Sequence, residues 1–255
     1  MNISNVNINK IIKYTKKHIE EYGVDEAFNQ MCKAVIDSNN AFYMFYFALE
    51  IKQADRDLFS KGVAETKNSQ YILWFAEYVD GANIEVLQDA IIKLGVYTDI
   101  TAFARDIKGA NVELLQQKIV ESKNAVAIYH FATQIPNVNV DVITNGILES
   151  HDVFYMHLVA KQFKGANVDL LRQGVAKYGS LEQIYLFAKE FGDDKEFTLQ
   201  NKILCSGNYK LIVKYARFVK GANKDLLLNR AKEIKSLKKA KSVNDILSEI
   251  EEERE

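Results

Sequence analysis

The fold of this chain is decided by the stretch Phe103-Ala104-Arg105-Asp106-Ile107-Lys108-Gly109-Ala110-Asn111-Val112-Glu113-Leu114-Leu115. This stretch recurs with drift along almost the whole sequence, and its reference alanine returns at intervals of 28 residues. The alanines in this register are Ala48, Ala76, Ala104, Ala132, Ala160, Ala188 and Ala216. A period held without an insertion is typical of repeat architectures, in which each unit is one supersecondary motif.

The composition favours a helical protein with little net charge. Hydrophobic residues make up 48% of the 255 residues, and Pro136 is the single proline. The formal net charge is −1, so no global field attracts the chain to nucleic acid or to a membrane surface. No stretch approaches the roughly 18 apolar residues of a membrane span, and residues 1–17 lack a signal-peptide core. The two distant cysteines, Cys32 and Cys205, suit a reducing compartment, so we expect a cytoplasmic protein.

Units of 28 residues fit the register from residue 12 onward. Their bounds are 12–39, 40–67, 68–95, 96–123, 124–151, 152–179, 180–207 and 208–235. Most units open with a residue type that caps helices, such as Asn40 or Asp152, and Val96 is an exception. The spaced apolar residues that follow, such as Phe103 and Ile107, predict an amphipathic first helix.

A turn and a second helix complete each unit. Glycine stands where the first helix must stop, as at Gly81 and Gly109, which predicts a left-handed backbone there. Two positions later an asparagine such as Asn83 can cap the second helix. One slot within that helix is often tiny, as at Gly62 and Gly174. Glycine inside a helix costs about 1 kcal/mol relative to alanine, so we expect a neighbouring backbone to approach closely at this slot.

Each helix–turn–helix hairpin cannot bury its apolar stripe alone, whereas stacked neighbours can. The arrangement resembles the α-solenoid superclass of TPR, HEAT and armadillo proteins over about residues 12–235, with a shorter unit and without their consensus motifs. The predicted fold is all-α, a right-handed α-solenoid of about eight 28-residue repeats in a single domain over residues 1–235. Residues 236–255 are expected to form a charged C-terminal capping helix, or alternatively an amphipathic segment that binds a partner.

No motif in the sequence predicts catalysis or a cofactor. A phosphate-binding glycine loop, a nucleophile elbow and a zinc-ligand cysteine cluster are all missing. His130 and His157 occupy nearly equivalent places on consecutive first helices, but a metal site would need a third ligand. Asp193 and Asp194 replace the glycine and alanine of a turn, and we interpret them as a variant turn rather than an acid/base pair. We therefore expect a non-enzymatic protein without a metal or a cofactor.

Polar residues recur at two adjacent slots of the second helices. The first slot holds Ser60, Gln88, Gln116, Thr144, Arg172, Gln200 and Leu228, and the second holds Lys61, Asp89, Gln117, Asn145, Gln173, Asn201 and Asn229. Repeated amides can contact a protein partner, or pair with base edges as in helical-repeat proteins that read one base per unit. They can equally be ordinary solvent-facing positions. The missing basic excess favours a protein over nucleic acid, because phosphate neutralisation supplies much of nucleic-acid affinity.

Basic residues gather near the ends of the first helices. This basic stripe comprises Arg105, Lys108, Lys161, Lys164, Lys189, Arg217 and Lys220. Cations near a helix C-terminus are favourable by about 0.3–1 kcal/mol without any ligand. The stripe is therefore explained either by the helices themselves or by an acidic partner or a phosphate backbone.

Aromatic residues crowd the first helices of the second and third units. Tyr46 and Trp74 occupy a slot that holds Ala102, His130 and Lys214 in other units, so we expect their rings to be partly exposed. Exposed Trp and Tyr side chains are typical anchors of protein interfaces. The alternative is that these rings add packing beneath the N-terminal unit.

The sequence thus predicts a non-enzymatic scaffold that docks a protein or peptide along one face of a curved helical surface. Tyr46 and Trp74 would anchor the partner. Selectivity would come from Gln88, Gln117, Asn145, Arg172, Gln173, Asn201 and Asn229. The second hypothesis is a nucleic-acid-binding helical-repeat protein that uses these amides and the basic stripe. No membrane partner is expected, and the sequence leaves the oligomeric state open.

Overall fold

The computed structural model describes residues 6–237, and all of the regular elements in these residues are helices. Their bounds are α1 (Ile8–Tyr22), α2 (Glu26–Asp37), α3 (Ala41–Glu50), α4 (Arg56–Glu65), α5 (Ser69–Tyr78), α6 (Ile84–Leu94), α7 (Tyr97–Asp106), α8 (Val112–Glu121), α9 (Ala125–Gln134), α10 (Val140–Ser150), α11 (Val153–Gln162), α12 (Val168–Tyr178), α13 (Leu181–Phe191), α14 (Thr198–Cys205) and α15 (Tyr209–Phe218). Helical backbone also runs over residues 224–237. The all-α prediction is confirmed for this part of the chain. Apart from residues 236 and 237, the predicted capping segment lies outside the described residues.

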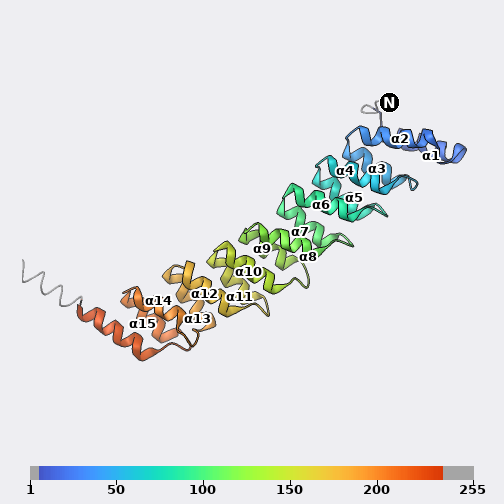
Figure 1. The fold of residues 1–255 in the computed structure, drawn as a ribbon. Helices are drawn as coiled ribbons and strands as arrows, with labels where there is room; N and C mark the ends of the chain where they lie inside the picture. Colours follow the sequence, from blue (N-terminus) through green and yellow to red (C-terminus); the bar gives the residue numbers. More distant parts are fainter. Residues whose placement is uncertain (1–5, 238–255) are drawn as a thin grey trace, which may run out of the picture. The chain divides into compact units, whose positions relative to one another are not determined.

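The chain groups into two compact units, whose helices are labelled in Figure 1. Unit 1 takes the residues up to 122 together with 130–138, and unit 2 takes residues 123–129 and the residues from 139 onward. Helix α9 contributes residues to both. The single repeat domain predicted over residues 1–235 stays a prediction.

The period of the sequence sets the positions of the helices. First helices begin at residues 41, 69, 97, 125, 153, 181 and 209, each 28 residues after the last. In unit 1, α3 contacts α5, α5 contacts α7, and α4 contacts α6. In unit 2, α11, α13 and α15 contact in succession, as do α10, α12 and α14. Each unit therefore has a first-helix layer and a second-helix layer (Figure 1).

The predicted turns and caps position the two helices of a hairpin. Gly109 has a left-handed backbone with φ of +87°, as expected for the residue that follows the first helix. Asn111 then accepts the backbone N–H of Leu114 on its side-chain oxygen at 3.0 Å and so caps α8. Val96, the expected exception, makes no side-chain cap bond at the start of α7.

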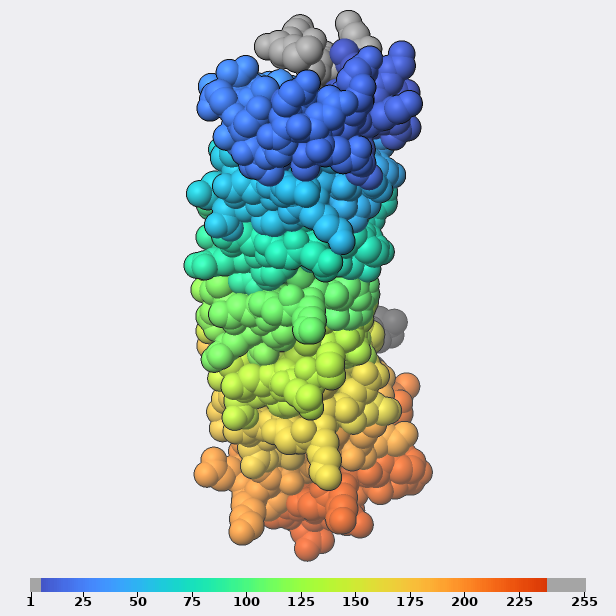
Figure 2. Space-filling model, turned by 90° about the vertical axis from the view of Figure 1, so that its right-hand side faces the viewer, coloured from blue at the N-terminus to red at the C-terminus, as the bar shows by residue number. Residues whose placement is uncertain are grey.

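The core is a set of four slots that repeats from hairpin to hairpin, and each side chain in it is at most 2% exposed. The two slots of the first helix hold Met44, Phe47, Ile72, Phe75, Ile100, Phe103, Ile128, Phe131, Met156, Val159, Ile184, Phe187, Ile212 and Tyr215. The two slots of the second helix hold Phe59, Val63, Leu87, Ile91, Leu115, Ile119, Ile143, Ile147, Leu171, Val175, Leu199, Ile203, Leu227 and Ala231. Complete burial of a large apolar side chain stabilises a fold by about 1.5–3 kcal/mol. The space-filling view shows the hairpins of unit 1, coloured blue to green, as layers in direct contact (Figure 2).

Small residues in the second helices mark close packing, but the close neighbours differ from those predicted. An added Cβ at Gly62 would lie 2.7 Å from Met44 Sδ, and one at Gly174 would lie 2.5 Å from Leu148 Cδ1. The glycines thus make room for long side chains of adjoining helices rather than for a neighbouring backbone. Ala90 holds the same slot in α6, and it lines an open groove instead.

The difference between these slots predicts a difference in tolerance to added volume. We expect Gly174→Val to lower the free energy of unfolding of the chain by about 1–3 kcal/mol, because the new methyl groups overpack the contact with Leu148. Ala90→Val is the matched control and should cost less than about 1 kcal/mol, since its methyl groups enter open space. Urea titrations followed by circular dichroism measure both, and equal losses would contradict the packing difference.

Candidate partner-binding surface

The second of the two polar slots faces solvent in both units. Its residues are Lys61, Asp89 and Gln117 in unit 1, and Asn145, Gln173, Asn201 and Asn229 in unit 2, and all of them are exposed. We name the members with amide side chains the amide row. In unit 2 the amide row runs along α10, α12, α14 and the helical residues 224–237. Gln117 of unit 1 and the four amides of unit 2 are therefore accessible to a partner, while their contact with one stays a prediction.

The first polar slot is buried except at Leu228, which is 42% exposed, and at Gln88 and Gln200 it serves the stacking of hairpins. Gln88 is 4% exposed, and its Oε1 accepts the backbone N–H of Asn111 at 2.7 Å. Gln200 is fully buried, and it accepts the backbone N–H of Asn223 at the same distance. Each bond ties a second helix to the residue that caps the next second helix. Gln88 was expected to contact a partner, but its side chain is buried inside unit 1 and hydrogen-bonded to the backbone of Asn111.

Arg172 departs from this pattern because the next hairpin lacks the asparagine cap. The side chain of Arg172 is buried in unit 2, and its Nη1 donates to Asp169 Oδ1. The following hairpin carries Asp193 and Asp194 in its turn. Burial acts to raise the pKa of Asp194, but hydrogen bonds from Thr198 and, to a smaller extent, the charge of Arg172 lower it below its ordinary value. Arg172 was also expected to contact a partner, but the structure places it among these carboxylates rather than at the surface.

Asp193 replaces the missing asparagine as the cap of α14. Its Oδ1 accepts the backbone N–H of Leu199 at 3.1 Å, and its Oδ2 accepts the backbone N–H of Gln200 at 2.8 Å. The hydroxyl of Tyr215 also donates to Oδ2 at 2.9 Å, and burial together with the Asp193 charge raises the pKa of Tyr215. The interpretation of Asp193 and Asp194 as a variant turn agrees with these bonds.

All seven residues of the basic stripe are exposed, but two of them already have carboxylate partners. Arg105 Nη2 lies 2.6 Å from Asp106 Oδ2, and the hydrogen bond holds the pKa of Asp106 below its ordinary value. Lys161 Nζ lies 2.7 Å from Glu190 Oε1. Among the described residues, the other five make no ion pair within 4.0 Å. The sequence therefore identified cations that are available to an acidic partner, chiefly in unit 2.

Tyr46 and Trp74 belong to an exposed group of rings in unit 1. We name Phe42, Tyr46, Tyr71 and Trp74 the aromatic patch. Phe42, Tyr46 and Trp74 are 37%, 37% and 36% exposed. The rings of Phe42 and Tyr46 lie 4.6 Å apart, and those of Tyr71 and Trp74 lie 5.2 Å apart, edge to face. Rings that hold one another in place while keeping an open face are suited to anchoring a partner.

The two explanations offered for the aromatic residues apply to different side chains. Tyr43 packs with the N-terminal segment, because its hydroxyl donates to the backbone carbonyl of Val6 at 2.9 Å. Tyr46 and Trp74 instead keep about a third of their surface in solvent. Their exposure agrees with the prediction, whereas their role in binding stays a prediction.

Exposed apolar side chains recur on the first-helix layer of unit 2, where the sequence analysis did not place them. Phe154 and Leu186 are 59% and 46% exposed, and Val126 is 59% exposed. Leu186 holds the repeat slot of Tyr46 and Trp74, while Val126 and Phe154 hold the slot of Phe42. Their shared position in the 28-residue repeat is the sequence signal that could have predicted this exposure, whatever the residue type.

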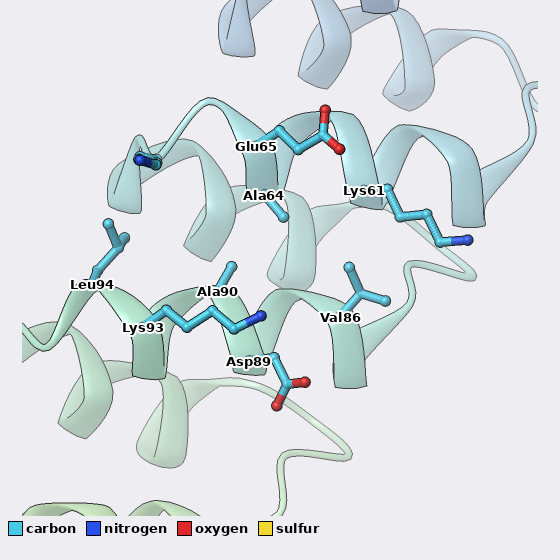
Figure 3. A pocket seen from close by; sticks show the side chains of 9 residues that line it. Lys61, Ala64, Glu65, Val86, Asp89, Ala90, Lys93 and Leu94 are labelled. Carbon is cyan, nitrogen blue, oxygen red and sulfur yellow. The ribbon is translucent and has the colours of Figure 1, made fainter.

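A groove on the second-helix layer of unit 1 is lined by residues of the neighbouring helices α4 and α6 (Figure 3). Its volume is about 610 Å³, with Ala64 and Ala90 among the residues that line it. Lys61, Asp89 and Lys93 project around it, so its rim mixes both signs of charge. The groove is open and presents no set of titratable groups aimed at one point, as a catalytic site requires.

The histidines do not form a metal site in the described residues. His157 Nε2 lies 2.5 Å from Glu190 Oε2, and His130 Nε2 lies 2.6 Å from the side-chain amide nitrogen of Gln134. Within residues 6–237 no group of three or more His, Cys, Asp or Glu side chains could hold a metal ion. The same residues include no helix with the length and apolar character that a membrane span requires.

No protein-family model matches the chain, and neither a curated protein nor a solved structure resembles it closely enough to count as a match.

The same substitution is predicted to lower the stability of the chain at the buried polar slot and to leave it almost unchanged at the exposed one. Gln88→Ala should lower the free energy of unfolding by about 1–3 kcal/mol, because the N–H of Asn111 loses its buried acceptor. Gln117→Ala, on the exposed slot of α8, should change it by less than about 0.5 kcal/mol. Urea midpoints of the full chain compare the two, and a loss at Gln117 equal to that at Gln88 would contradict the assigned roles.

Proposed function

We propose that this chain is a non-enzymatic scaffold that binds a protein or a peptide on its first-helix layer. The exposed aromatic patch of unit 1 carries the proposal. Monomeric proteins bury most large aromatic rings, and neighbouring exposed rings mark contact surfaces. Trp and Tyr lead the residue types at which truncation costs a complex about 2 kcal/mol or more.

The division of residue types between the two layers supports the same proposal. Large apolar side chains stay exposed at two repeated slots of the first helices, in unit 1 at Phe42, Tyr46 and Trp74 and in unit 2 at Phe154 and Leu186. The second-helix layer exposes the amide row and the carboxylates of its first turns, and its exposed apolar residues in the described part of the chain, such as Leu58, Leu226 and Leu228, include no aromatic ring. A partner on the first-helix layer gains apolar burial from several hairpins at once, and this gain is the main source of affinity in protein association.

We further propose that the stacked hairpins within each unit form a right-handed α-solenoid of the TPR, HEAT and armadillo kind. Repeat proteins of this kind bind partners along an extended surface that several units share. We place the protein in the cytoplasm, because both cysteines are free and Cys205 is exposed. Burial, with the Asp55 charge as a smaller cause, raises the pKa of Cys32 to about 11, so Cys32 stays a thiol at neutral pH.

The second candidate function is nucleic-acid binding, and the exposed amide row of unit 2 is the observation that favours it. Asn145, Gln173, Asn201 and Asn229 return once per hairpin, as a base-reading array would require. The basic stripe, however, lies on the first helices and in the turns just after them, whereas the amide row lies on the second helices. Phosphate contacts and base contacts would therefore have to come from different layers, which makes protein binding the stronger candidate.

A capture experiment tests the first candidate. The full-length chain is used to capture partners from its native host cells, and the affinity of the captured protein is then measured by titration. Trp74→Ala and Tyr46→Ala should each weaken that affinity by about 2 kcal/mol, because the partner loses an anchoring ring. Tyr78→Ala is the matched control, since Tyr78 is 54% exposed on α5 but lies outside the aromatic patch.

Two results would count against the scaffold proposal. One is a partner whose affinity is the same for the parent chain, Trp74→Ala and Tyr46→Ala while the helical spectrum is kept. The other is nucleic-acid binding that falls by a factor on the order of a thousand between low and moderate salt, as counterion release requires. The second result would favour the amide row and the basic stripe as the binding residues.

A further inference from the structure

A groove on the first-helix layer of unit 2 lies between α11 and α13. Phe154, Leu158 and Leu186 are among the residues that line it, and its volume is about 290 Å³. A second hollow of about 510 Å³ shares His157, Lys161 and Leu186 with the first and continues to Lys189 and Glu190. The two hollows therefore form one groove with an apolar half and a charged half.

The apolar half of the groove lacks a covering partner in the described residues. Phe154 is 59% exposed, and its ring lies 5.2 Å from the ring of Tyr155 on the same helix. Leu186 is 46% exposed on the facing helix. Between residues 153 and 161 a helix rises by about 12 Å, which is the length of about four residues of an extended peptide. The apolar hollow of about 290 Å³ has room for a bulky apolar side chain of a short segment between Phe154 and Leu186.

The charged half contains one carboxylate, that of Glu190, and the side chains of Lys161 and His157 already contact it. Glu190 Oε2 lies 2.5 Å from His157 Nε2, and Glu190 Oε1 lies 2.7 Å from Lys161 Nζ. Hydrogen bonds from Lys161 and His157 keep the pKa of Glu190 below its ordinary value, so the side chain stays ionised. The His157 ring also meets Phe187 and Phe191 edge to face at 5.6 and 5.5 Å, which fixes its orientation.

Lys189 brings a second lysine to this end of the groove, and three other basic residues lie at helix ends elsewhere in unit 2. Lys189 lines the groove at the C-terminal part of α13, and Lys164, Arg217 and Lys220 lie at or just beyond the ends of α11 and α15. All four are exposed, and none makes an ion pair among the described residues. With Glu190 neutralised, the charged half of the groove keeps an excess of positive charge.

We propose that this groove binds an acidic peptide segment of a partner protein. A bulky apolar side chain of the segment packs against Phe154, Leu158 and Leu186, and an adjacent carboxylate pairs with Lys189. The apolar walls discriminate against a polyanion without apolar side chains, and the cations discriminate against a neutral apolar segment. This inference rests on the proposed function, because it assigns a partner chemistry to the first-helix layer.

The test is a selection of short random peptides on the immobilised full-length chain. Enriched peptides are synthesised with a fluorophore, and their affinity for the chain and its variants is measured by anisotropy. We expect enriched peptides to carry Asp or Glu beside Leu, Ile, Met, Phe or Trp. Leu186→Ser and Lys189→Glu should each weaken binding by about tenfold or more, because one removes an apolar wall and the other reverses a charge.

Matched controls separate this groove from other surfaces. Lys202→Glu reverses an exposed charge on α14, in the second-helix layer, and should change the affinity by less than about twofold. Phe154→Ser is a second variant of the apolar wall and should weaken binding as Leu186→Ser does, and circular dichroism verifies that every variant keeps its helices. Affinity that also falls as salt is raised would support the charged contacts.

The inference and the proposed function can fail separately. Enriched peptides without acidic residues, or with affinity unchanged in Leu186→Ser and Lys189→Glu, would overturn the inference. If those same peptides lose affinity in Trp74→Ala, the proposed function stands with its site in unit 1. If no peptide is enriched on the parent chain, the inference is overturned, and capture from the host cells decides the proposed function by itself.

Discussion

The structure depends on the burial of four apolar slots that no hairpin can cover alone. Phe103 of α7 and Leu115 of α8 are fully buried, although each lies on a helix of only ten residues. Isolated helices of this length are marginal in water, so their stability must come from packing against neighbours. Because each hairpin shares its core with adjacent hairpins, the stacking inside each unit and the surfaces that it creates are consequences of the same burial.

Buried polar bonds add direction to this packing. An apolar slot accepts many arrangements of a neighbour, whereas Gln88 Oε1 has one backbone N–H within reach, that of Asn111. The hairpin of residues 180–207 also caps its second helix with a part-buried polar contact, but with different residue types. Lys195 stands at its cap position, Asp193 takes over the capping of α14, and the buried slot of α12 becomes Arg172. The slot therefore holds a hydrogen-bond donor near carboxylates in α12, whereas in α6 it holds an acceptor, Gln88 Oε1, for a backbone N–H.

The same repeat presents different surfaces in unit 1 and in unit 2. Slots that need no burial drift freely in sequence, and they hold Tyr46 and Trp74 in unit 1 but Leu158 and Leu186 in unit 2. Unit 1 therefore presents an aromatic patch, whereas unit 2 presents an apolar groove next to unpaired cations. If the proposed scaffold function holds, different hairpins recognise different features of a partner while the core stays the same.

The sequence by itself determined the helices, their period, the asparagine caps and the left-handed turn at Gly109, because these follow from local backbone chemistry. It also predicted the partial exposure of Tyr46 and Trp74. It could not tell that Gln88 is buried while Gln117, at the neighbouring slot of the next unit, is exposed. Adjacent residues of a helix point about 100° apart, and only the rotation of each helix against its neighbours decides which of them enters the core. The groove beside Leu186 likewise exists only because two helices separated in sequence pack side by side.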